Sequence, residues 1–280
     1  MTEKKLIAYL GVIGSFSYLS AKEVFPNDEL VGFKSFAEAV GAVKENNFDY
    51  VILPVENSEA GRVADVHGIL PKSELFINGE HYKRIENNIL ATKNASLASI
   101  KKVLSHVHAL AQCSNKIKEL KLEPVNFSST AGAAEEISKL NDPSLCAIAS
   151  IEAGKQYELQ VLAENIENSK NNTTRFLIIS KNMIIPENIE NKKTITTMFF
   201  KLKNIPAALY EALGSFAKHN INMTRIESCI GSFISASFIV DVEAHLESEE
   251  FKLAIKDLET KVEEIKILGV YHASEFRKNI

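Results

Sequence analysis

The stretch LIAYLGVIGSFS occupies residues 6–17 and indicates the fold class. Its first part, residues 6–10, is a short apolar run of the length of a buried strand. Gly11 and Gly14 follow, ahead of serines, as is typical of a strand that turns through glycines into a helix. Two lysines precede the run, as in export signals, but glycines and serines interrupt its apolar core. We therefore expect a strand, a glycine turn and a helix.

The same alternation of short apolar runs and helical patterns continues to about residue 180. Ser35-Phe36-Ala37-Glu38 has the form of a capping box, and the helix that it opens would bury Val40 and Val43. Further strands are predicted at Tyr50 to Leu53, Lys102 to Leu104, Leu145 to Ala149 and Arg175 to Ile179, and helices around Ala109 to Leu120 and Ala131 to Leu140. This alternation predicts an α/β domain with buried strands.

A polar, asparagine-rich stretch that contains Pro186 separates this region from a second pattern. From Thr194 the sequence predicts, in order, a strand to Lys203, a helix with Pro206 in its first turn to about Lys218, strands at 223–228 and 233–242, a helix at 248–260 and a strand at 262–271. The order βαββαβ is that of a ferredoxin-like domain. We therefore place one domain at residues 1–185 and a second at 194–280.

The composition excludes several classes of partner. The chain has 280 residues, 45% of them apolar, and a formal net charge of −4, which favours neither nucleic acid nor another polyanion. No run approaches the roughly 18 apolar residues of a membrane span. Cys113, Cys146 and Cys229 lie far apart, and His106 and His108 have no ligand-spaced partners, so neither disulfides nor a metal site is predicted. A reducing, cytoplasmic location fits best.

Polar residues follow several of the predicted strands, where open α/β sheets bind ligands. Each cluster has a structural alternative, because glycine turns, helix caps and surface ion pairs use the same residue types. Together they suggest a site rich in hydroxyls and amides. The clusters are Gly11 to Ser17, Pro54 to Ser58, Ser105-His106 with Gln112, Ser128 to Thr130, and Asn172 to Phe176.

Taken in order, these clusters resemble the motifs of the prephenate dehydratase family over essentially the whole chain. The motifs are Tyr9-Leu10-Gly11 to Phe16-Ser17, Leu53 to Ser58 with Gly61, Ser105-His106 with Ala109 to Cys113, Ser129 to Ala131 with Ala133-Ala134, Ala147 to Ser150, and Asn172 with Thr174-Arg175-Phe176. The C-terminal segment resembles the ACT domain, with ligand loops at Asn204 to Leu209 and at Ile226 to Ser228.

The resemblance implies a carbon–oxygen lyase that converts prephenate to phenylpyruvate in L-phenylalanine biosynthesis, without a cofactor. The implied catalytic domain has two lobes around a cleft, similar to periplasmic binding proteins of the second type. One lobe would hold residues 1–77 and 166–185, and the other 78–165. The implied catalytic residues are Thr174, Glu56, Asn57, Ser105 and Gln112, with Thr174 as the essential donor to the leaving hydroxyl. The implied substrate-binding residues are Gly14, Ser15, Phe16, Ser58, Ser129, Thr130, Ala131, Arg175 and Phe176.

For the C-terminal domain the resemblance implies a homodimer or homotetramer and an amino-acid effector, L-phenylalanine. The implied effector contacts are Ala207, Ala208, Leu209, Asn222, Glu227 and Ser228.

The chain departs from the family pattern at several positions: Val66 and Gly68 after Gly61, Val107 and His108 in the third motif, and Ala207, Cys229 and Ile230 in the ligand loops. These departures put substrate preference, rate and effector affinity in question. Three alternatives remain: an arogenate dehydratase, a non-catalytic solute- or amino-acid-binding protein, and a purely regulatory homologue.

Overall fold

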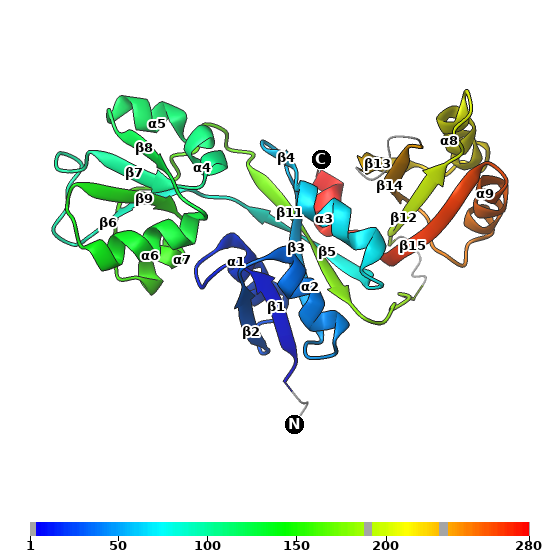
Figure 1. Cartoon of the computed structure of the whole chain (residues 1–280), viewed down its shortest axis with the longest axis horizontal. Helices are drawn as coiled ribbons and strands as arrows, with labels where there is room; N and C mark the ends of the chain where they lie inside the picture. The colour runs from blue at the N-terminus through cyan, green and yellow to red at the C-terminus, as the bar shows by residue number, and fades with distance from the viewer. Residues whose placement is uncertain (1–3, 188–191, 230–234, 280) are drawn as a thin grey trace. The chain divides into compact units, whose positions relative to one another are not determined.

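The computed structural model describes residues 4–187, 192–229 and 235–279. The chain forms two compact units (Figure 1). Unit 1 comprises Met1–Ala42, Ile52–Val63 and Tyr82–Phe176, and unit 2 comprises Val43–Val51, Ala64–His81 and Leu177–Ile280. The chain passes between the units inside three strands, β3 (Tyr50–Asn57), β5 (Phe76–Arg84) and β11 (Thr173–Ser180).

Unit 1 begins with the predicted strand, turn and helix. β1 (Leu6–Leu10) leads through the glycine turn into α1 (Phe16–Val24), and β1 pairs in parallel with β2 (Glu29–Phe33), a strand that the sequence patterns did not reveal. The N-cap half of the predicted capping box at the start of α2 (Phe36–Lys44) is confirmed, because the amide of Glu38 donates to Ser35 Oγ at 3.2 Å, whereas the reciprocal bond from the Ser35 amide to the Glu38 side chain is absent among the described residues.

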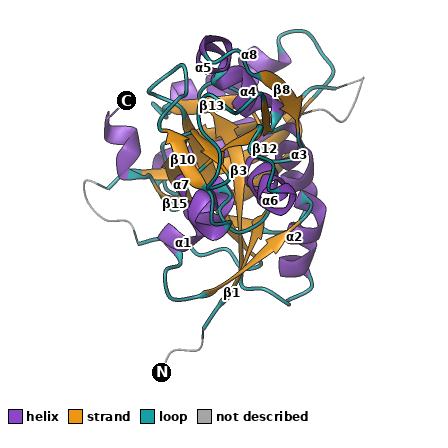
Figure 2. Ribbon diagram, turned by 90° about the vertical axis from the view of Figure 1, so that its left-hand side faces the viewer, coloured by secondary structure: helices purple, strands orange, loops and turns teal. Residues whose placement is uncertain are grey.

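A separate five-stranded sheet, here called the second sheet, is built from residues 88–163 of unit 1, inside the stretch predicted to form the second lobe. Its strands lie in the order β10-β6-β9-β7-β8, with bounds Gln160–Ala163, Asn88–Ala91, Leu145–Ala149, Lys102–Ser105 and Glu123–Asn126. Figure 1 and Figure 2 show its helices, which are α4 (Val107–Gln112), α5 (Ser114–Glu119), α6 (Thr130–Leu140) and α7 (Ile151–Gln156).

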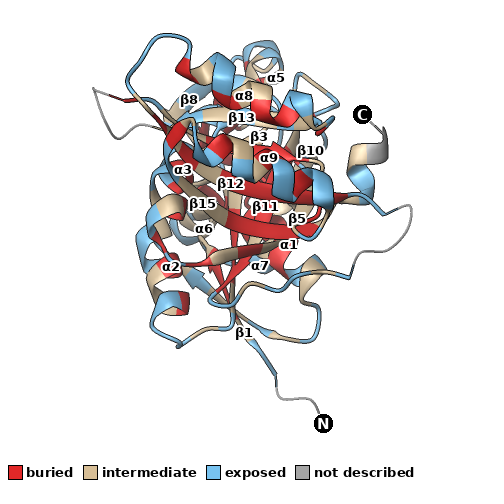
Figure 3. Cartoon of the chain, turned by 90° about the vertical axis from the view of Figure 1, so that its right-hand side faces the viewer, coloured by how far each residue is buried: buried red, intermediate tan, exposed pale blue. Residues whose placement is uncertain are grey.

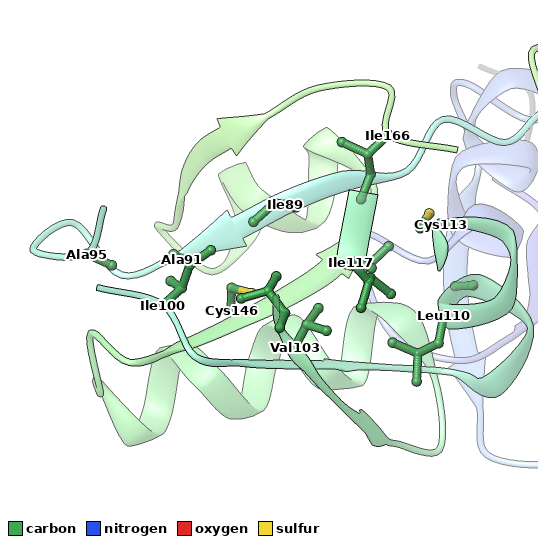
Figure 4. Packing of buried hydrophobic residues seen from close by; sticks show 13 residues of the cluster. Ile89, Ala91, Ala95, Ile100, Val103, Leu110, Cys113, Ile117, Cys146 and Ile166 are labelled. Atoms are coloured by element: carbon green, nitrogen blue, oxygen red, sulfur yellow. The ribbon is translucent and has the colours of Figure 1, made fainter. Parts of the chain in front are cut away.

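Alternate residues of the second sheet face two different cores, as the strand period of two requires. One core joins Ile89, Val103 and Cys146 to Leu110 and Ile117 of α4 and α5 (Figure 4). The other joins the neighbouring residues Leu90, Leu104, Ala147 and Ala149 to Ala131, Ala134, Ile137 and Ala153 of α6 and α7. Helices therefore cover both faces of this sheet, and the α/β class predicted for the region is confirmed.

The predicted βαββαβ order is confirmed in unit 2. It comprises β12 (Thr194–Leu202), α8 (Ala208–Lys218), β13 (Met223–Cys229), β14 (Ser237–Val242), α9 (Glu249–Glu259) and β15 (Val262–His272), and the strands lie in the ferredoxin-like order β13-β14-β12-β15. Most of β12 is buried (Figure 3), and its Met198 and Phe200 pack against Phe216 of α8 and Phe251 of α9.

Two local predictions need correction, and a third falls partly outside the described residues. The stretch at 109–120 is not one helix, because α4 ends at Gln112 and α5 begins at Ser114. Pro206 lies ahead of α8, not in its first turn. The strand expected from Phe233 is described only from Ser237, and Phe233 itself lies outside the described residues, as does Ile230.

Unit 2 also contains residues from the predicted first domain, in α3 (Ala64–Ile69), the 3₁₀ turn η1 (Leu70–Lys72) and the first part of β5. β15 pairs in parallel with β5 at Gly269 and Ile77, where a side chain on Gly269 would collide with the carbonyl oxygen of Ile77. Arg277, in the C-terminal 3₁₀ turn η2 (Glu275–Asn279), binds Glu80 of β5. No helix within the described ranges is both long enough and apolar enough to cross a membrane.

Candidate active site

Asn57 ends β3 and starts the turn into β4 (Gly61–Arg62), and this turn lies within unit 1. Its Oδ1 accepts the backbone N–H groups of Glu59 at 3.0 Å and Ala60 at 2.8 Å, which is the Asx turn that asparagine favours. Gly61 completes the turn with a positive φ of 79°. Because backbone N–H groups only donate, the side-chain atom that faces them must be the amide oxygen, and the orientation of the Asn57 amide is therefore fixed.

Three side-chain amides close a ring of hydrogen bonds around this turn. Gln112 Nε2 donates to Asn57 Oδ1 at 3.2 Å, Asn172 Nδ2 donates to Gln112 Oε1 at 3.0 Å, and Asn57 Nδ2 donates to Asn172 Oδ1 at 2.8 Å. The fixed orientation of Asn57 sets the other two, since each amide can satisfy its neighbour in only one way. We call Asn57, Gln112 and Asn172 the amide ring.

The amide ring orients the hydroxyl of Thr174 in β11. Asn57 Nδ2 donates to Thr174 Oγ1 at 2.9 Å, so this oxygen is an acceptor and its own hydrogen points elsewhere. Within residues 4–187, 192–229 and 235–279, that hydrogen has no hydrogen-bond acceptor. Thr174 is 8% exposed, so the residue is largely buried. The site therefore holds an oriented hydroxyl donor with a free hydrogen.

Main-chain contacts of Ser58 hold the two contributing segments together. Ser58 Oγ donates to the carbonyl of Asn171 at 2.9 Å and accepts the amide of Thr173 at 3.0 Å, and the Ser58 amide donates to the carbonyl of Thr173 at 2.9 Å. On the far side, the amide of Ile85 donates to the carbonyl of Asn172 at 2.8 Å. Ser58, named from the sequence as a substrate contact, thus has a clear positioning role.

Other residues named from the sequence lie outside the amide ring. Ser105 is fully buried and donates to the carbonyl of Ile148 at 2.7 Å, which joins β7 to β9. Ser15 and Ser129 cap α1 and α6, where they accept the amides of Tyr18 and Gly132 at 3.1 Å. Ala131 and Phe176 belong to the buried interior. Of the rest, Gly14 and Arg175 are buried, while Glu56, Phe16 and Thr130 are partly exposed.

Two residues that the motifs contain received no role from the sequence. Asn172 completes the amide ring, and Ser150 joins the glycine turn to α7 through a hydrogen bond to the carbonyl of Gly14. Asn172 stands at the end of an asparagine-rich run, a composition that predicts a loop and not a site. Its position directly before Thr173 and Thr174 is the one sequence feature that indicates a role in the site.

A cavity of about 210 Å³ lies beside the amide ring, lined by Glu59, Ala111, Gln112, Glu167, Asn168, Ser169 and Asn172. Thr174 does not line it, and two of its residues are carboxylates. Two carboxylates give this cavity a negative lining, which favours a neutral or cationic ligand over an anionic one.

The residues named as effector contacts do not meet at one place within a single chain. Ala207 precedes α8 in the left-handed region with φ of 60°, while Ala208 is buried and Leu209 packs on the same core. Glu227 and Ser228 lie near the end of β13, whereas Asn222 lies before its start and donates to Glu243 Oε2 at 3.0 Å. Six residues of extended chain separate Asn222 from Ser228 by about 20 Å.

Comparison with known proteins gives a consistent result. A model of the prephenate dehydratase domain matches residues 7–184. A Komagataeibacter europaeus protein named bifunctional N-acyl-homoserine lactone acylase/prephenate dehydratase is 38% identical over 281 residues, which cover 99% of each chain. An Arabidopsis thaliana protein named arogenate dehydratase/prephenate dehydratase 2 is 34% identical over 95% of this chain and 72% of that protein.

A solved structure extends the likeness to three dimensions. The prephenate dehydratase of Arthrobacter aurescens, in complex with L-Phe, superposes with a TM-score of 0.88 at 28% identity, over 96% of this chain and 90% of that chain. The sequence motifs, the α/β and βαββαβ architecture and these relatives agree, and the chain belongs to the prephenate dehydratase family.

Proposed function

We propose that the chain catalyses the decarboxylating dehydration of prephenate to phenylpyruvate, with Thr174 as the hydrogen-bond donor to the departing hydroxyl. One observation carries the proposal. Because Thr174 Oγ1 accepts a hydrogen bond from Asn57 Nδ2, its own hydrogen remains available to a substrate oxygen. A donor that is oriented before the reaction stabilises developing charge without reorganisation.

The bond changes define what the protein must supply. The bond from the ring to its carboxylate breaks and releases carbon dioxide, the electron pair moves through the ring, and the ring carbon–oxygen bond breaks. The leaving hydroxide takes up one proton, which in the net reaction comes from solvent, and departs as water. Aromatisation drives these steps, so the protein must orient the substrate and stabilise the oxygen that gains charge. The scheme needs no metal, redox or other cofactor.

A threonine hydroxyl is a poor acid in bulk water, so its environment has to strengthen it. The hydrogen bond from Asn57 draws electron density from Thr174 Oγ1 and makes its hydrogen a better donor, as in other chains of hydrogen bonds. The amide ring keeps this geometry fixed. Arg175, the amides of the glycine turn, and Ser129 with Thr130 are the residues we propose for the two substrate carboxylates.

Arogenate, the aminated counterpart of prephenate, is the second candidate substrate, and one relative carries both activities in its name. The test is to incubate purified protein with each compound and to follow phenylpyruvate and phenylalanine. We expect phenylpyruvate from prephenate. Turnover of arogenate alone would move the assignment to arogenate dehydratase, and no turnover of either would reject the proposed function.

We also propose that the βαββαβ region of unit 2 binds L-phenylalanine as a feedback effector, that the chain forms a homodimer or homotetramer, and that it acts in the cytoplasm. The effector role is supported by the similar Arthrobacter aurescens prephenate dehydratase, which was solved in complex with L-Phe. Calorimetric titration with L-phenylalanine tests the effector role, and light scattering tests the oligomeric state. No binding and no inhibition at millimolar L-phenylalanine would remove the effector role.

A further inference from the structure

The glycine turn after β1 rests directly on α7, which covers the second sheet, and both belong to unit 1. Ser150 makes the central contact: its Oγ accepts the amide of Ala153 at 3.0 Å as the cap of α7 and donates to the carbonyl of Gly14 at 2.6 Å. Ser150 is 3% exposed, so this hydrogen bond is shielded from water. One hydroxyl thus joins two segments that are 136 residues apart in the sequence.

Tyr157, at the other end of α7, makes a second contact with the same turn. Its hydroxyl donates to the carbonyl of Ile13 at 3.3 Å. Burial, and secondarily the nearby charge of Glu135, raise the pKa of the Tyr157 phenol, which therefore remains a protonated donor at neutral pH. A third contact is the ion pair of Lys22 in α1 with Glu152 in α7 at 3.3 Å.

The approach of the turn to α7 is closer than any residue except glycine permits. A Cβ on Gly14 would lie 2.6 Å from Cα and 2.9 Å from the backbone nitrogen of Ala153. Gly14 also has a positive φ of 86°, which side-chain-bearing residues rarely adopt. The steric fit and the two hydrogen bonds therefore specify the same arrangement independently.

The turn that is held in this way offers unused donors. Within the described part of the chain, the backbone N–H groups of Val12, Ile13 and Gly14 make no hydrogen bond, whereas Gly11 and Ser15 donate to the carbonyls of Phe33 and Val12. Val12 and Ile13 are 36% and 41% exposed. Successive unpaired N–H groups beside a helix start suit a carboxylate.

We propose that Ser150 and Tyr157 are positioning residues, which hold the glycine turn on α7 in the conformation that binds a substrate carboxylate. This inference rests on the proposed dehydratase function. If the turn were released, it would have to be ordered again each time substrate binds, and that cost would appear as a higher KM. A contact equal in the ground and transition states leaves kcat nearly unchanged.

The test compares Ser150→Ala, which removes the hydroxyl, with Tyr157→Phe, which removes one oxygen and retains the ring. Ser35→Ala is the matched control, because Ser35 caps α2 in the same manner and, among the described residues, makes no hydrogen bond to the turn. We expect Ser150→Ala to raise KM for prephenate roughly 5- to 30-fold, the equivalent of one buried hydrogen bond. Tyr157→Phe, which loses a solvent-exposed hydrogen bond, should raise KM roughly 2- to 5-fold, and kcat should stay within about threefold of the parent in both variants. Ser150→Thr retains the hydroxyl and should largely restore KM.

Hydrogen exchange of the amides at 10–18 gives a readout that does not depend on turnover. Exchange should accelerate in Ser150→Ala and Tyr157→Phe and stay at the parental rate in Ser35→Ala. The inference would be overturned if Tyr157→Phe had the same exchange rates and the same KM as the parent protein, and Ser150→Ala also had the same exchange rates as the parent. A parent protein without dehydratase activity would instead reject the proposed function, and the exchange rates would still decide whether the contact holds the turn.

Discussion

Asn57 shows how a backbone turn determines chemistry at the scale of a single residue. Two main-chain N–H groups face its Oδ1, so its Nδ2 must point at Asn172 and Thr174. The sequence identified Thr174, Asn57 and Gln112 through their motifs. The orientation of Asn57 itself comes from a local turn, but the sequence could not show that its amide meets Gln112 and Thr174, because these partners lie more than 50 residues away along the chain.

The variant Asn57→Asp tests this orientation, because it replaces the donor Nδ2 with an acceptor of nearly the same size. The Thr174 hydroxyl would then donate to the carboxylate and lose the hydrogen needed by the substrate. We expect kcat with prephenate to fall roughly 10²- to 10³-fold with a folded protein. Asn168→Asp is the control, since Asn168 lies beside the amide ring without joining it. Equal rates for Asn57→Asp and its parent would show that Thr174 does not depend on the ring.

The cap of α4 gives a pH prediction. His106 Nδ1 accepts the amide of His108 at 3.4 Å, and burial, with a smaller effect of the His108 charge, lowers the pKa of His106 below its ordinary value of 6.5. The folded state therefore binds fewer protons than the unfolded state, so His106 lowers the stability as the pH falls through 6.5. Urea unfolding at pH 7.5 and 5.5 should show a larger loss for the parent than for His106→Asn, which retains a capping acceptor. Equal losses would exclude this histidine as a source of acid sensitivity.

At the scale of secondary-structure elements, the sequence was informative where hydrophobic periodicity was strong. α6, α8 and α9 carry clear apolar stripes, β1 and β9 are apolar runs, and β12 is rich in β-branched and aromatic residues. β5 was missed because FINGEHYKR mixes polar and apolar residues, and its partner β15 is remote in sequence. The break between α4 and α5 at Cys113 could not be predicted, because no proline or glycine occurs there.

The turn before α8 gives a prediction at this scale. Ala207 has a φ of 60°, in the left-handed region that costs an alanine roughly 1 kcal/mol and a glycine almost nothing. Ala207→Gly should therefore relax the proposed effector loop and tighten L-phenylalanine binding several-fold, whereas the free energy of unfolding should change by less than about 1 kcal/mol, because glycine also stabilises the unfolded chain. Calorimetric titration measures the affinity of the parent and of Ala207→Gly for L-phenylalanine. Weaker binding by Ala207→Gly would contradict the role given to this loop.

At the scale of the whole molecule, the sequence predicted two domains joined by a polar linker, but the C-terminal module is not self-contained. Unit 2 includes part of β5, whose Glu80 side chain has no exposed surface. Arg277 Nε and Nη2 donate to the two Glu80 oxygens at 2.7 and 2.9 Å. A contact between residues 197 apart leaves no local pattern, so sequence periodicity could not reveal it. Removing the chain from Thr194 onward would leave a buried carboxylate without this partner.

The ion pair predicts a large effect on stability. Arg277→Ala leaves the buried Glu80 charge without its guanidinium, and we expect the free energy of unfolding of unit 2 to fall by about 3 kcal/mol. Lys93→Ala is the control, because Lys93 pairs with Glu158 at the surface, where both side chains are more than 70% exposed, and it should have almost no effect. Urea unfolding followed by circular dichroism gives both values. If the free energy of unfolding fell by the same small amount in both variants, the ion pair between Arg277 and Glu80 would not contribute to the stability of unit 2.

The most direct measurement is the steady-state turnover of prephenate by Thr174→Val beside Thr174→Ser. Valine retains the shape of threonine and removes the hydroxyl, whereas serine retains the hydroxyl. We expect Thr174→Val to lose roughly 10²- to 10⁴-fold in kcat with KM within a fewfold of the parent, because the lost donor acts on the transition state. Thr174→Ser should stay within about tenfold of the parent. Near-parental kcat in Thr174→Val would contradict the assignment of Thr174 as the donor to the leaving hydroxyl.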